Sequence, residues 1–417
     1  MNAAAAHMDR PAVLVIFILT YLGLAAGRVP GLKLDRTGIV ILGAIALMVF
    51  GGLTTGDVVG YVNWPTILLL FGFFVISAQL RLSGFFDSVA RAVARRLDHP
   101  ANFLMLLMLA TAGLSAFLNH DIVCYAFTPI VGAALLKRRI NPVPFLIALA
   151  IASNIGAAAT IVGNPQDMMI AQIAGLSFGR YALWCLPPVL VALGSAYGIT
   201  WLLSRHQLQA FEAAPEATAH AAQGHAYNKP HTVKGLAILG VVIALFFSPI
   251  PKEIVALTAA GIHLASRKFR TADLLGIVDW PILVLFMGLF VVTGAFQTTG
   301  YGDLAVHWLA AHGLQLSSPV VLALSTAALS NLINNAAAVL LLLKVANVAH
   351  APAAYVLALA NSFGGSLVIS GSVSNIIVVE QARELGIPIS FKSFLRLGAP
   401  VTLAAMAAML GWVVIAH

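Results

Sequence analysis

Long apolar segments that carry almost no charge are the feature that most restricts how this chain can fold. About 20 apolar residues suffice to cross the hydrocarbon layer of a bilayer. Segments approaching that length lie at 12–27, 38–53, 65–82, 143–162, 182–203, 235–250, 253–267, 281–298, 353–371 and 396–415. Only 9% of the 417 residues are charged, whereas soluble domains average about 25%. The sequence therefore predicts an all-α polytopic membrane protein with about ten spanning helices, held in a lipid bilayer.

Two further apolar segments, 102–136 and 318–345, are each interrupted in the middle by polar residues. The interruptions are Asn-His-Asp at 119–121 and Asn-Asn at 334–335. Each segment can be read as a pair of helices or as a re-entrant hairpin whose tip lies within the membrane. Irregular backbone is tolerated at that depth only when it is buried in protein or lines a cavity. Either reading returns the chain to the face from which it came.

The positive charges indicate the orientation. With the spans above, 19 of the 23 lysines and arginines fall on one side of the membrane. The other four are Arg10, Arg180, Lys252 and Lys344. Loops rich in Lys and Arg stay in the cytoplasm, so both termini are predicted to be periplasmic in an inner-membrane protein. The net charge of +8 then reflects topology, and no nucleic-acid partner is expected.

The two halves of the chain repeat one another. Residues 55–65 and 271–281 share Asp, Gly, Trp and Pro at one spacing, and Gly163 matches Gly371 further on. Each half crosses the membrane an odd number of times, so the repeats are inverted, as is typical of secondary transporters. We expect a first repeat at 1–203, a cytoplasmic linker at 204–233 and a second repeat at 234–417. The linker carries four irregularly spaced histidines, which favours a flexible tether over a metal site. These are His206, His220, His225 and His231.

Four polar segments lie at membrane depth: the two interruptions above and two glycine-rich stretches near 152–167 and 361–375. Gly163-Asn164-Pro165 is expected to break a helix, since Pro lacks a donor and Gly tolerates unwound backbone. Broken helices expose N–H groups that attract anions, and carbonyls and Asn side chains that ligate small cations. The predicted substrate or ion-binding residues are Asn119, Asn154, Gly163, Asn164, Asp167, Asn334, Asn335, Gly371, Ser372 and Asn375. For Asp167, a place in the site and a place near the external surface are both open.

Asp121 is the most informative of these polar residues. A carboxylate at the bilayer centre costs roughly 2.5–3.5 kcal/mol on insertion scales, so a functional role is favoured. We predict that Asp121 takes up and releases a coupling proton or helps to ligate Na⁺. His120 is either a second proton acceptor or the hydrogen-bond partner of Asp121. Two cysteines exclude a disulfide framework and a cysteine-rich metal site, and no resident cofactor or metal is predicted.

Several of these motifs resemble the arsenite/antimonite efflux carriers of the ion transporter superfamily. They are residues 117–123 followed by 128–131, residues 163–167 and residues 330–335. That superfamily also includes citrate–metal carriers, dicarboxylate symporters and sodium/proton antiporters. The resemblance implies a re-entrant hairpin and a discontinuous helix in each half, with substrate and ion bound between the tips and the breaks. It also implies a homodimer. His120 departs from the Asn-Asp of the arsenite carriers at the first tip, and Ser372 follows Gly371 where the first break has Asn and Pro.

The expected function is secondary active transport by alternating access, coupled to protons or sodium, by symport or antiport. No Walker-type loop for ATP occurs. The predicted substrate is a small oxyanion or an arsenite- or antimonite-like species. No Lys or Arg is expected at the centre, except that Lys344 could approach it. An anionic substrate would then rely on helix ends, whereas a neutral hydroxide needs no counter-charge. Alternatives are a sodium-coupled di- or tricarboxylate symporter, a Na⁺/H⁺ antiporter, a channel, and an intramembrane enzyme using Asp121 and Asp167.

Overall fold

The computed structural model describes residues 8–27, 33–97, 99–205, 226–265, 268–346 and 351–416. Its elements are helices. The first half contains α1 (Arg10–Ala26), α2 (Arg36–Val49), α3 (Thr55–Tyr61), α4 (Trp64–Leu82), α5 (Phe85–Ala94), α6 (Pro100–Phe117), α7 (His120–Lys137), α8 (Val143–Ala157), α9 (Pro165–Ile173) and α10 (Phe178–Ser204). The second half contains α11 (Lys229–Leu245), α12 (Lys252–Leu264), α13 (Thr271–Leu275), α14 (Trp280–Thr298), α15 (Tyr301–Ala311), α16 (Pro319–Leu332), α17 (Asn335–Val345), α18 (Ala351–Gly364), the 3-10 helix η2 (Ile369–Gly371), α19 (Val373–Glu384) and α20 (Phe391–Ala416).

A helix lies at each of the ten apolar segments found in the sequence. Five helices of the described part are long and apolar enough to cross a membrane by themselves, namely α4, α6, α10, α14 and α20. Polar residues just outside several segments define their starts. Asp35, for example, accepts a hydrogen bond from the Gly38 backbone N–H at 2.8 Å, which satisfies one of the free donors at the beginning of α2. The prediction of an all-helical membrane protein is confirmed.

Two helices end earlier than the apolar pattern predicts. The segments 143–162 and 353–371 were expected to be continuous, but α8 stops at Ala157 and α18 at Gly364. The chain continues through irregular backbone at 158–164 and 365–372, and helix resumes as α9 and α19. Hydrophobicity continues across these breaks while the hydrogen-bond ladder does not. Gly163 and Pro165 interrupt the ladder at the first break, whereas the second contains glycines and no proline. Apolar content alone could not locate these ends.

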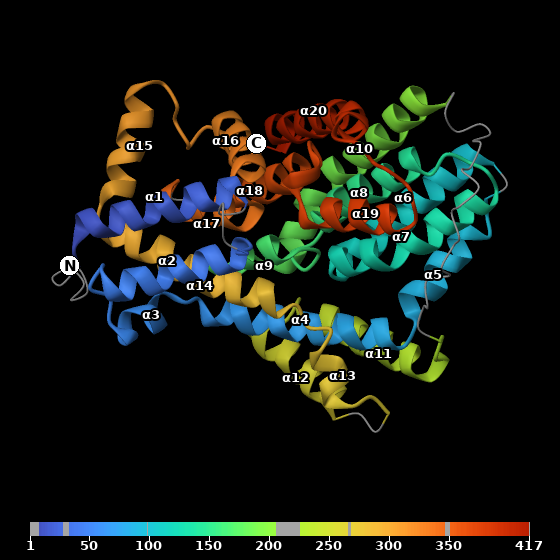
Figure 1. Ribbon diagram of the computed structural model, residues 1–417, viewed down its shortest axis with the longest axis horizontal. Helices are drawn as coiled ribbons and strands as arrows, with labels where there is room; N and C mark the ends of the chain where they lie inside the picture. Colours follow the sequence, from blue (N-terminus) through green and yellow to red (C-terminus); the bar gives the residue numbers. More distant parts are fainter. Residues whose placement is uncertain are drawn as a thin grey trace.

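Each of the two interrupted segments forms two helices joined by a very short turn. Residues 118–119 separate α6 from α7, and residues 333–334 separate α16 from α17. Figure 1 shows α6 and α7 in the right half of the molecule and α17 in the left half. The broken helices cross between the two groups, since α19 packs against α7 and α8 while α9 packs against α17 and α18. The turns and the breaks are thereby brought together near the middle.

Corresponding elements of the two halves occupy opposite ends of the molecule. In Figure 1, α3 and α15 lie toward the left, whereas α13 and α5 lie toward the right. Helix α2 packs against α14, and α12 packs against α4. Glycines permit both approaches: a Cβ on Gly288 would touch the Val40 side chain at 2.6 Å, and one on Gly72 would touch Ala256 at 2.7 Å. Gly72 matches Gly288 in the sequence repeat. In each half, the helix that carries this glycine therefore packs against a helix of the other half.

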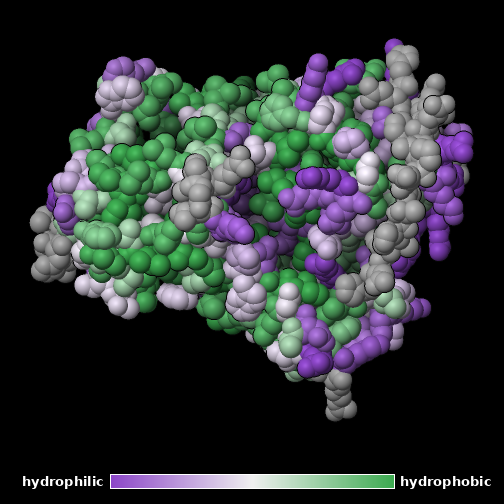
Figure 2. All heavy atoms as spheres, viewed as in Figure 1, coloured by the Kyte–Doolittle hydropathy of each residue, from purple (hydrophilic) through white to green (hydrophobic). Residues whose placement is uncertain are grey.

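The surface separates into apolar and charged regions. Apolar residues cover much of the face in Figure 2, and hydrophilic residues gather at the right end and extend toward the middle. The right end is where α5 and the basic end of α7 lie. Of the linker histidines, His231 lies in the first turn of α11. The others, His206, His220 and His225, fall outside the described residues.

Candidate functional site

The two turns are built in the same way. At the first, Asn119 Oδ1 accepts a hydrogen bond from the Asp121 backbone N–H at 2.8 Å. At the second, Asn334 Oδ1 accepts one from the Ala336 N–H at 2.7 Å. Each asparagine thus caps the helix that follows it, a role for which its short side chain is well suited. The amide oxygens are used in capping, which leaves the amide NH₂ groups for other partners.

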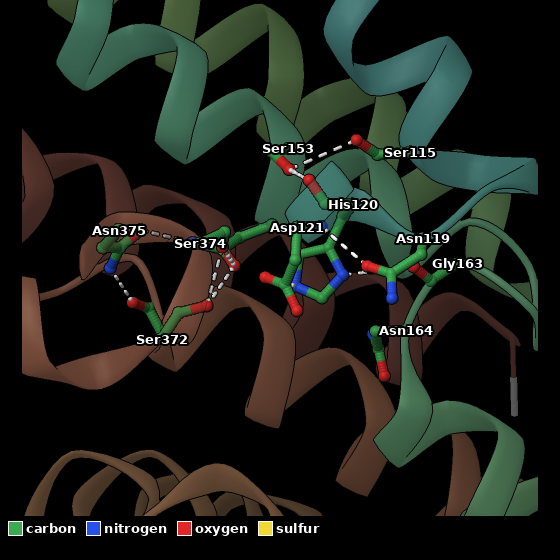
Figure 3. A network of polar contacts seen from close by, with 12 residues as sticks. Ser115, Asn119, His120, Asp121, Ser153, Gly163, Asn164, Ser372, Ser374 and Asn375 are labelled. Atoms are coloured by element: carbon green, nitrogen blue, oxygen red, sulfur yellow. Dashed lines mark hydrogen bonds and ion pairs between the residues drawn. The ribbon is translucent and has the colours of Figure 1, made fainter. Parts of the chain in front are cut away.

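The first turn lies directly on the first break. His120 Nδ1 is 3.2 Å from the Gly163 carbonyl oxygen, so a proton on Nδ1 donates to that carbonyl. The other ring nitrogen, Nε2, is then 3.6 Å from Asp121 Oδ1. Figure 3 shows His120 and Asp121 between Gly163 and Asn164 on one side and Ser372 and Ser374 on the other. The imidazole therefore joins the carboxylate to the unwound backbone, and both side chains are buried.

Asn164 organises the start of α9. Its Oδ1 accepts from the Asp167 N–H at 2.7 Å, and its Nδ2 donates to Asp167 Oδ2 at 2.7 Å. Asp167 is fully buried, and its Oδ1 has no hydrogen-bond partner in the described part of the chain. Two positions of Asp167 were left open by the sequence, and its burial contradicts the one near the external surface. This carboxyl group lies inside the protein behind Asn164.

The second break is held by a compact network of amides and hydroxyls. Asn154 Oδ1 accepts from Ser372 Oγ at 2.9 Å and from Ser374 Oγ at 3.0 Å. Asn154 Nδ2 donates to Asn375 Oδ1 at 2.9 Å. Asn375 Nδ2 in turn donates to the Gly365 and Val368 carbonyls at 2.7 and 2.9 Å. These bonds satisfy carbonyls that the end of α18 leaves without helical partners.

Two hydrogen bonds between the halves are related by the sequence repeat. The register that matches Gly163 to Gly371 also matches Asn164 to Ser372 and Asn154 to Ser362. Asn164 Nδ2 donates to Ser362 Oγ at 3.1 Å, and Ser372 Oγ donates to Asn154 Oδ1 at 2.9 Å. Each break is thus tied to the helix that precedes the break in the other half. The two breaks form one unit.

A cavity lies where the turns and the breaks meet, and we call it the central cavity. It is lined by Arg36, His120, Asp121, Pro165, Gln166, Ile282, Leu285, Phe286, Asn334, Asn335, Ala336, Ser370, Gly371, Ser372 and Val373. Its volume, counted as the space open to the centre of a water molecule, is about 30 Å³. The first residues of α7, α9, α17 and α19 are all in the lining. Four helix N-termini, each carrying partial positive charge, therefore surround one small space.

Two charged side chains face this cavity. Asp121 is 6% exposed, and its Oδ1 has no hydrogen-bond partner among the described residues. Arg36 is the first residue of α2. Its guanidinium forms no hydrogen bond or ion pair with any residue that the structure describes. The expectation that Lys344 alone could approach the centre is wrong, since Lys344 lies in the last turn of α17 and outside the lining.

The predicted site residues divide into two groups. His120, Asp121, Asn334, Asn335, Gly371 and Ser372 line the central cavity. Asn154, Gly163, Asn164, Asp167 and Asn375 lie behind it and hold the breaks, and Asn119 caps α7. Sequence reasoning missed Arg36 and Gln166. Arg36 was counted as a topology signal, and Gln166 follows the Gly-Asn-Pro break directly, which is the pattern that could have identified it.

The chemistry of the lining suits an anion better than a metal ion. N–H groups at helix ends, a free guanidinium and amide NH₂ groups are donors, whereas Asp121 is the one carboxylate in the lining. Within the described residues, no group of three or more His, Cys, Asp or Glu side chains could hold a metal ion. An ionised Asp121 repels a bound anion, whereas a protonated Asp121 does not. The lining therefore suits an anion and places two titratable side chains, His120 and Asp121, beside it.

Known proteins are similar to this chain in sequence and in fold. Residues 12–360 match the family model described as citrate transporter, CitMHS. A transporter of Mycobacterium tuberculosis is 32% identical, over 94% of this chain and 95% of its own. The silicon efflux transporter of Oryza sativa is 27% identical, over 91% and 92%. In fold, the chain is similar to the YdaH transporter of Alcanivorax borkumensis, with a TM-score of 0.52 at 16% identity and 97% coverage of both chains.

These matches extend over nearly the whole chain, and they agree with a multi-pass helical fold in which apolar helices surround a polar centre. The resemblance to the ion transporter superfamily that the turn and break motifs suggested is confirmed. The family and the relatives of this chain are membrane transporters. The chain belongs to the citrate transporter family, CitMHS, of the ion transporter superfamily.

Proposed function

We propose that this protein is a proton-coupled secondary transporter that carries a small oxyanion across the inner membrane by alternating access. One observation carries the proposal: four helix N-termini and the free guanidinium of Arg36 line the central cavity together with the carboxylate of Asp121, whose Oδ1 accepts no hydrogen bond from the described residues. The helix N-termini and the guanidinium attract an anion, and the carboxylate of Asp121 supplies a site for a proton. Transport, and no enzymatic reaction, is the proposed activity.

The size of the cavity favours a small substrate. The space open to the centre of a water molecule is about 30 Å³, whereas a cavity needs about 10–15 Å³ by this measure to hold one water molecule. A small inorganic oxyanion demands less rearrangement of this lining than a tricarboxylate does. A relative named as a silicon efflux transporter supports this class. Citrate is the second candidate, because the family description names it.

The charges suggest how proton and substrate are coupled. Two like charges about 4 Å apart repel by about 4 kcal/mol at an effective dielectric constant of about 20. An anion in the central cavity is therefore disfavoured while Asp121 is ionised and favoured once Asp121 is protonated. The proton and the anion then bind together, which is the requirement for symport. His120 holds the carboxylate in place through the Gly163 carbonyl.

Alternating access is supported by the repeated architecture. The related pairs Asn164–Ser362 and Ser372–Asn154, the two helical turns and the exchanged packing of α2 and α12 are the features expected of inverted repeats. We assign the first repeat to 1–203, the linker to 204–233 and the second repeat to 234–417, with two re-entrant hairpins and two discontinuous helices. Both termini are then periplasmic. A homodimer is proposed from the family resemblance.

Transport by the purified protein in proteoliposomes tests this function. The substrates are arsenite, antimonite, silicate, citrate and succinate, each with an imposed pH gradient or Na⁺ gradient. We expect accumulation of an inorganic oxyanion when protons flow in the same direction, with no response to Na⁺. Accumulation of citrate alone, a sodium requirement, or proton flow in the opposite direction would each contradict a part of the proposal. Flux that never exceeds equilibration would indicate a channel.

Asp121→Asn sharpens the test because an amide resembles a protonated carboxyl group. We expect this variant to exchange internal for external substrate at a rate close to the wild type, while accumulation driven by a pH gradient is lost. Glu384→Gln, at an exposed position in α19, is the matched control and should behave as the wild type. If Asp121→Asn accumulates substrate normally, Asp121 is not the coupling group.

A further inference from the structure

A second cavity opens beside the central one. It is lined by Phe74, Arg81, Asn119, Asp121, Ile122, Tyr125, Ile277, Val278, Asp279, Pro281 and Ile377. By the same measure its volume is about 260 Å³, which is room for several water molecules. Asp121 is the residue that the two linings share. One carboxyl group therefore lies between two separate spaces, of which only the central cavity contains Arg36 and the four helix N-termini.

A second carboxyl group, Asp279, faces this second cavity. Asp279 precedes α14, and one of its oxygens accepts a hydrogen bond from the Ile282 N–H at 3.1 Å. In the other half, Asn63 occupies the matching position and caps α4 through the Thr66 N–H at 3.0 Å. A neutral amide is thus sufficient for this cap. The negative charge at Asp279 is an addition that capping does not explain, and the sequence places it in one half only.

The surroundings of Asp279 contain both signs of charge. Helix α7 contributes Asp121 and Tyr125, and α4 contributes Arg81, whose guanidinium lies 4.2 Å from the centre of the Tyr125 ring. Asp35 and Arg36 begin α2 next to Thr37, whose hydroxyl donates to the Pro281 carbonyl at 3.4 Å. The contribution of α19, Ile377, is apolar. Asp279 itself lies in the connection before the spanning helix, where burial raises its pKa to about 6 and the nearby charge of Asp121 adds to this effect.

We propose that the second cavity is the proton path to Asp121, with Asp279 as the relay group, and that it is separate from the path of the substrate. The Asp279 carboxylate takes a proton from hydronium and releases water. It then passes the proton through water in the cavity to the Asp121 carboxylate and returns to its ionised form. Because the two paths meet only at Asp121, a proton can arrive while an anion occupies the central cavity. This inference rests on the proposed role of Asp121 as the coupling group.

Asp279→Asn in proteoliposomes is the test. The amide keeps the cap, as Asn63 does, so the fold is expected to survive. At external pH values from 5 to 8, we expect uptake driven by a pH gradient to fall at least about tenfold and to lose its inflection near pH 6. Exchange of internal for external substrate without a gradient moves no net proton and should be unchanged. Asp279→Glu should restore driven uptake, and Asp273→Asn, an exposed acid in α13, should match the wild type.

A second variant acts on the cavity itself. Ile277→Trp places a large side chain in the lining and should reduce driven uptake while sparing exchange, which also serves if Asp279→Asn does not fold. Normal driven uptake with an unaltered pH profile in both variants would overturn the inference, as would equal loss of exchange and driven uptake. These results are distinct from failure of the proposed function, in which the wild type itself would show no uptake driven by protons.

Discussion

Arg36 changes what the central cavity is expected to bind. A guanidinium is always charged and presents several N–H donors in a plane that matches an oxyanion. In this structure it faces the cavity and has no partner among the described residues. An unpartnered cation beside four helix N-termini is costly unless an anion completes the site. At the scale of single residues, we therefore propose that Arg36 sets the charge of the substrate and that Asp121 sets its coupling.

Arg36→Gln should weaken substrate binding more than it slows transport. A hydrogen bond to a charged group contributes about 1.5–3 kcal/mol, so the KM for an anionic substrate should rise by about 10- to 150-fold. The maximal rate should change much less. Arg36→Lys keeps the charge without the planar donors, and its KM should lie between those of the wild type and Arg36→Gln. The dependence of the initial uptake rate on substrate concentration measures all three proteins.

Lys33→Gln is the matched control for this prediction. Lys33 precedes α2 by three residues and is exposed, so its loss should leave the KM near that of the wild type. If Arg36→Gln and Lys33→Gln had the same KM, Arg36 would contribute only to the surface charge that fixes topology. Equal KM values for the wild type and Arg36→Gln would also remove the main reason for preferring an anion.

Residue types were predictable from the sequence to different degrees. Asp121 could be identified because a carboxylate in an uncharged segment needs a compensating role. Arg36 could not, because an arginine at the start of an apolar segment also fits the pattern of a cytoplasmic loop. Asn154 and Asn375 are both buried, and their partners are each other, two serines and nearby backbone. Which polar groups face a cavity depends on the direction of their side chains. The spacing of residues along the chain does not reveal this direction.

At the scale of elements, close contact between helices positions the turns. Helix α6 packs against α8, and a Cβ on Gly156 would overlap the backbone of Ala112. Gly156→Ala should therefore push α6 away from α8 and displace the turn that carries Asp121. Overpacking of this kind costs about 1–3 kcal/mol. We expect a lower unfolding temperature in detergent, together with reduced transport.

Gly113→Ala provides the comparison within the same helix pair. A Cβ at Gly113 would meet nothing within 4 Å, and Ala is favoured over Gly inside a helix by about 0.5–1 kcal/mol. Its unfolding temperature should equal or slightly exceed that of the wild type, with transport retained. Similar destabilisation by both substitutions would mean that α6 and α8 are not held by this contact.

Elements were easier to predict than their ends. Ten apolar segments produced ten helices, since a chain in lipid must satisfy its backbone hydrogen bonds internally. The early ends of α8 and α18 were not visible in hydrophobicity, and the first break was visible only through Gly163-Asn164-Pro165. The second lacks a proline and is held instead by the Asn154 network. Contacts between distant segments decide such a break, and no local pattern contains them.

At the scale of the whole molecule, we propose from the matched packing of the two halves that the protein has a second conformation. The register that matches Trp64-Pro65 to Trp280-Pro281 also matches Thr66 to Ile282. Ile282 lines the central cavity, while Thr66 is fully buried. If the halves exchange roles during transport, these two positions should exchange environments. Arg36 and the start of α14 line this cavity, and the orientation proposed from the charge pattern places them toward the cytoplasm.

Cysteine accessibility tests this exchange. A hydrophilic maleimide that does not cross membranes should modify Ile282→Cys from the cytoplasmic side only. Thr66→Cys should be protected at rest and should react from the periplasmic side during turnover. Ala196→Cys, in a buried position of α10, should remain unmodified throughout. The native Cys124 and Cys185 are both buried, so their background labelling should be low, and replacing both with Ala removes it.

Modification of Ile282→Cys from both sides at once would indicate a continuous pore, and modification from the periplasmic side alone would reverse the orientation. A Thr66→Cys variant that transports but never reacts would rule out exchange of the two halves as the basis of transport.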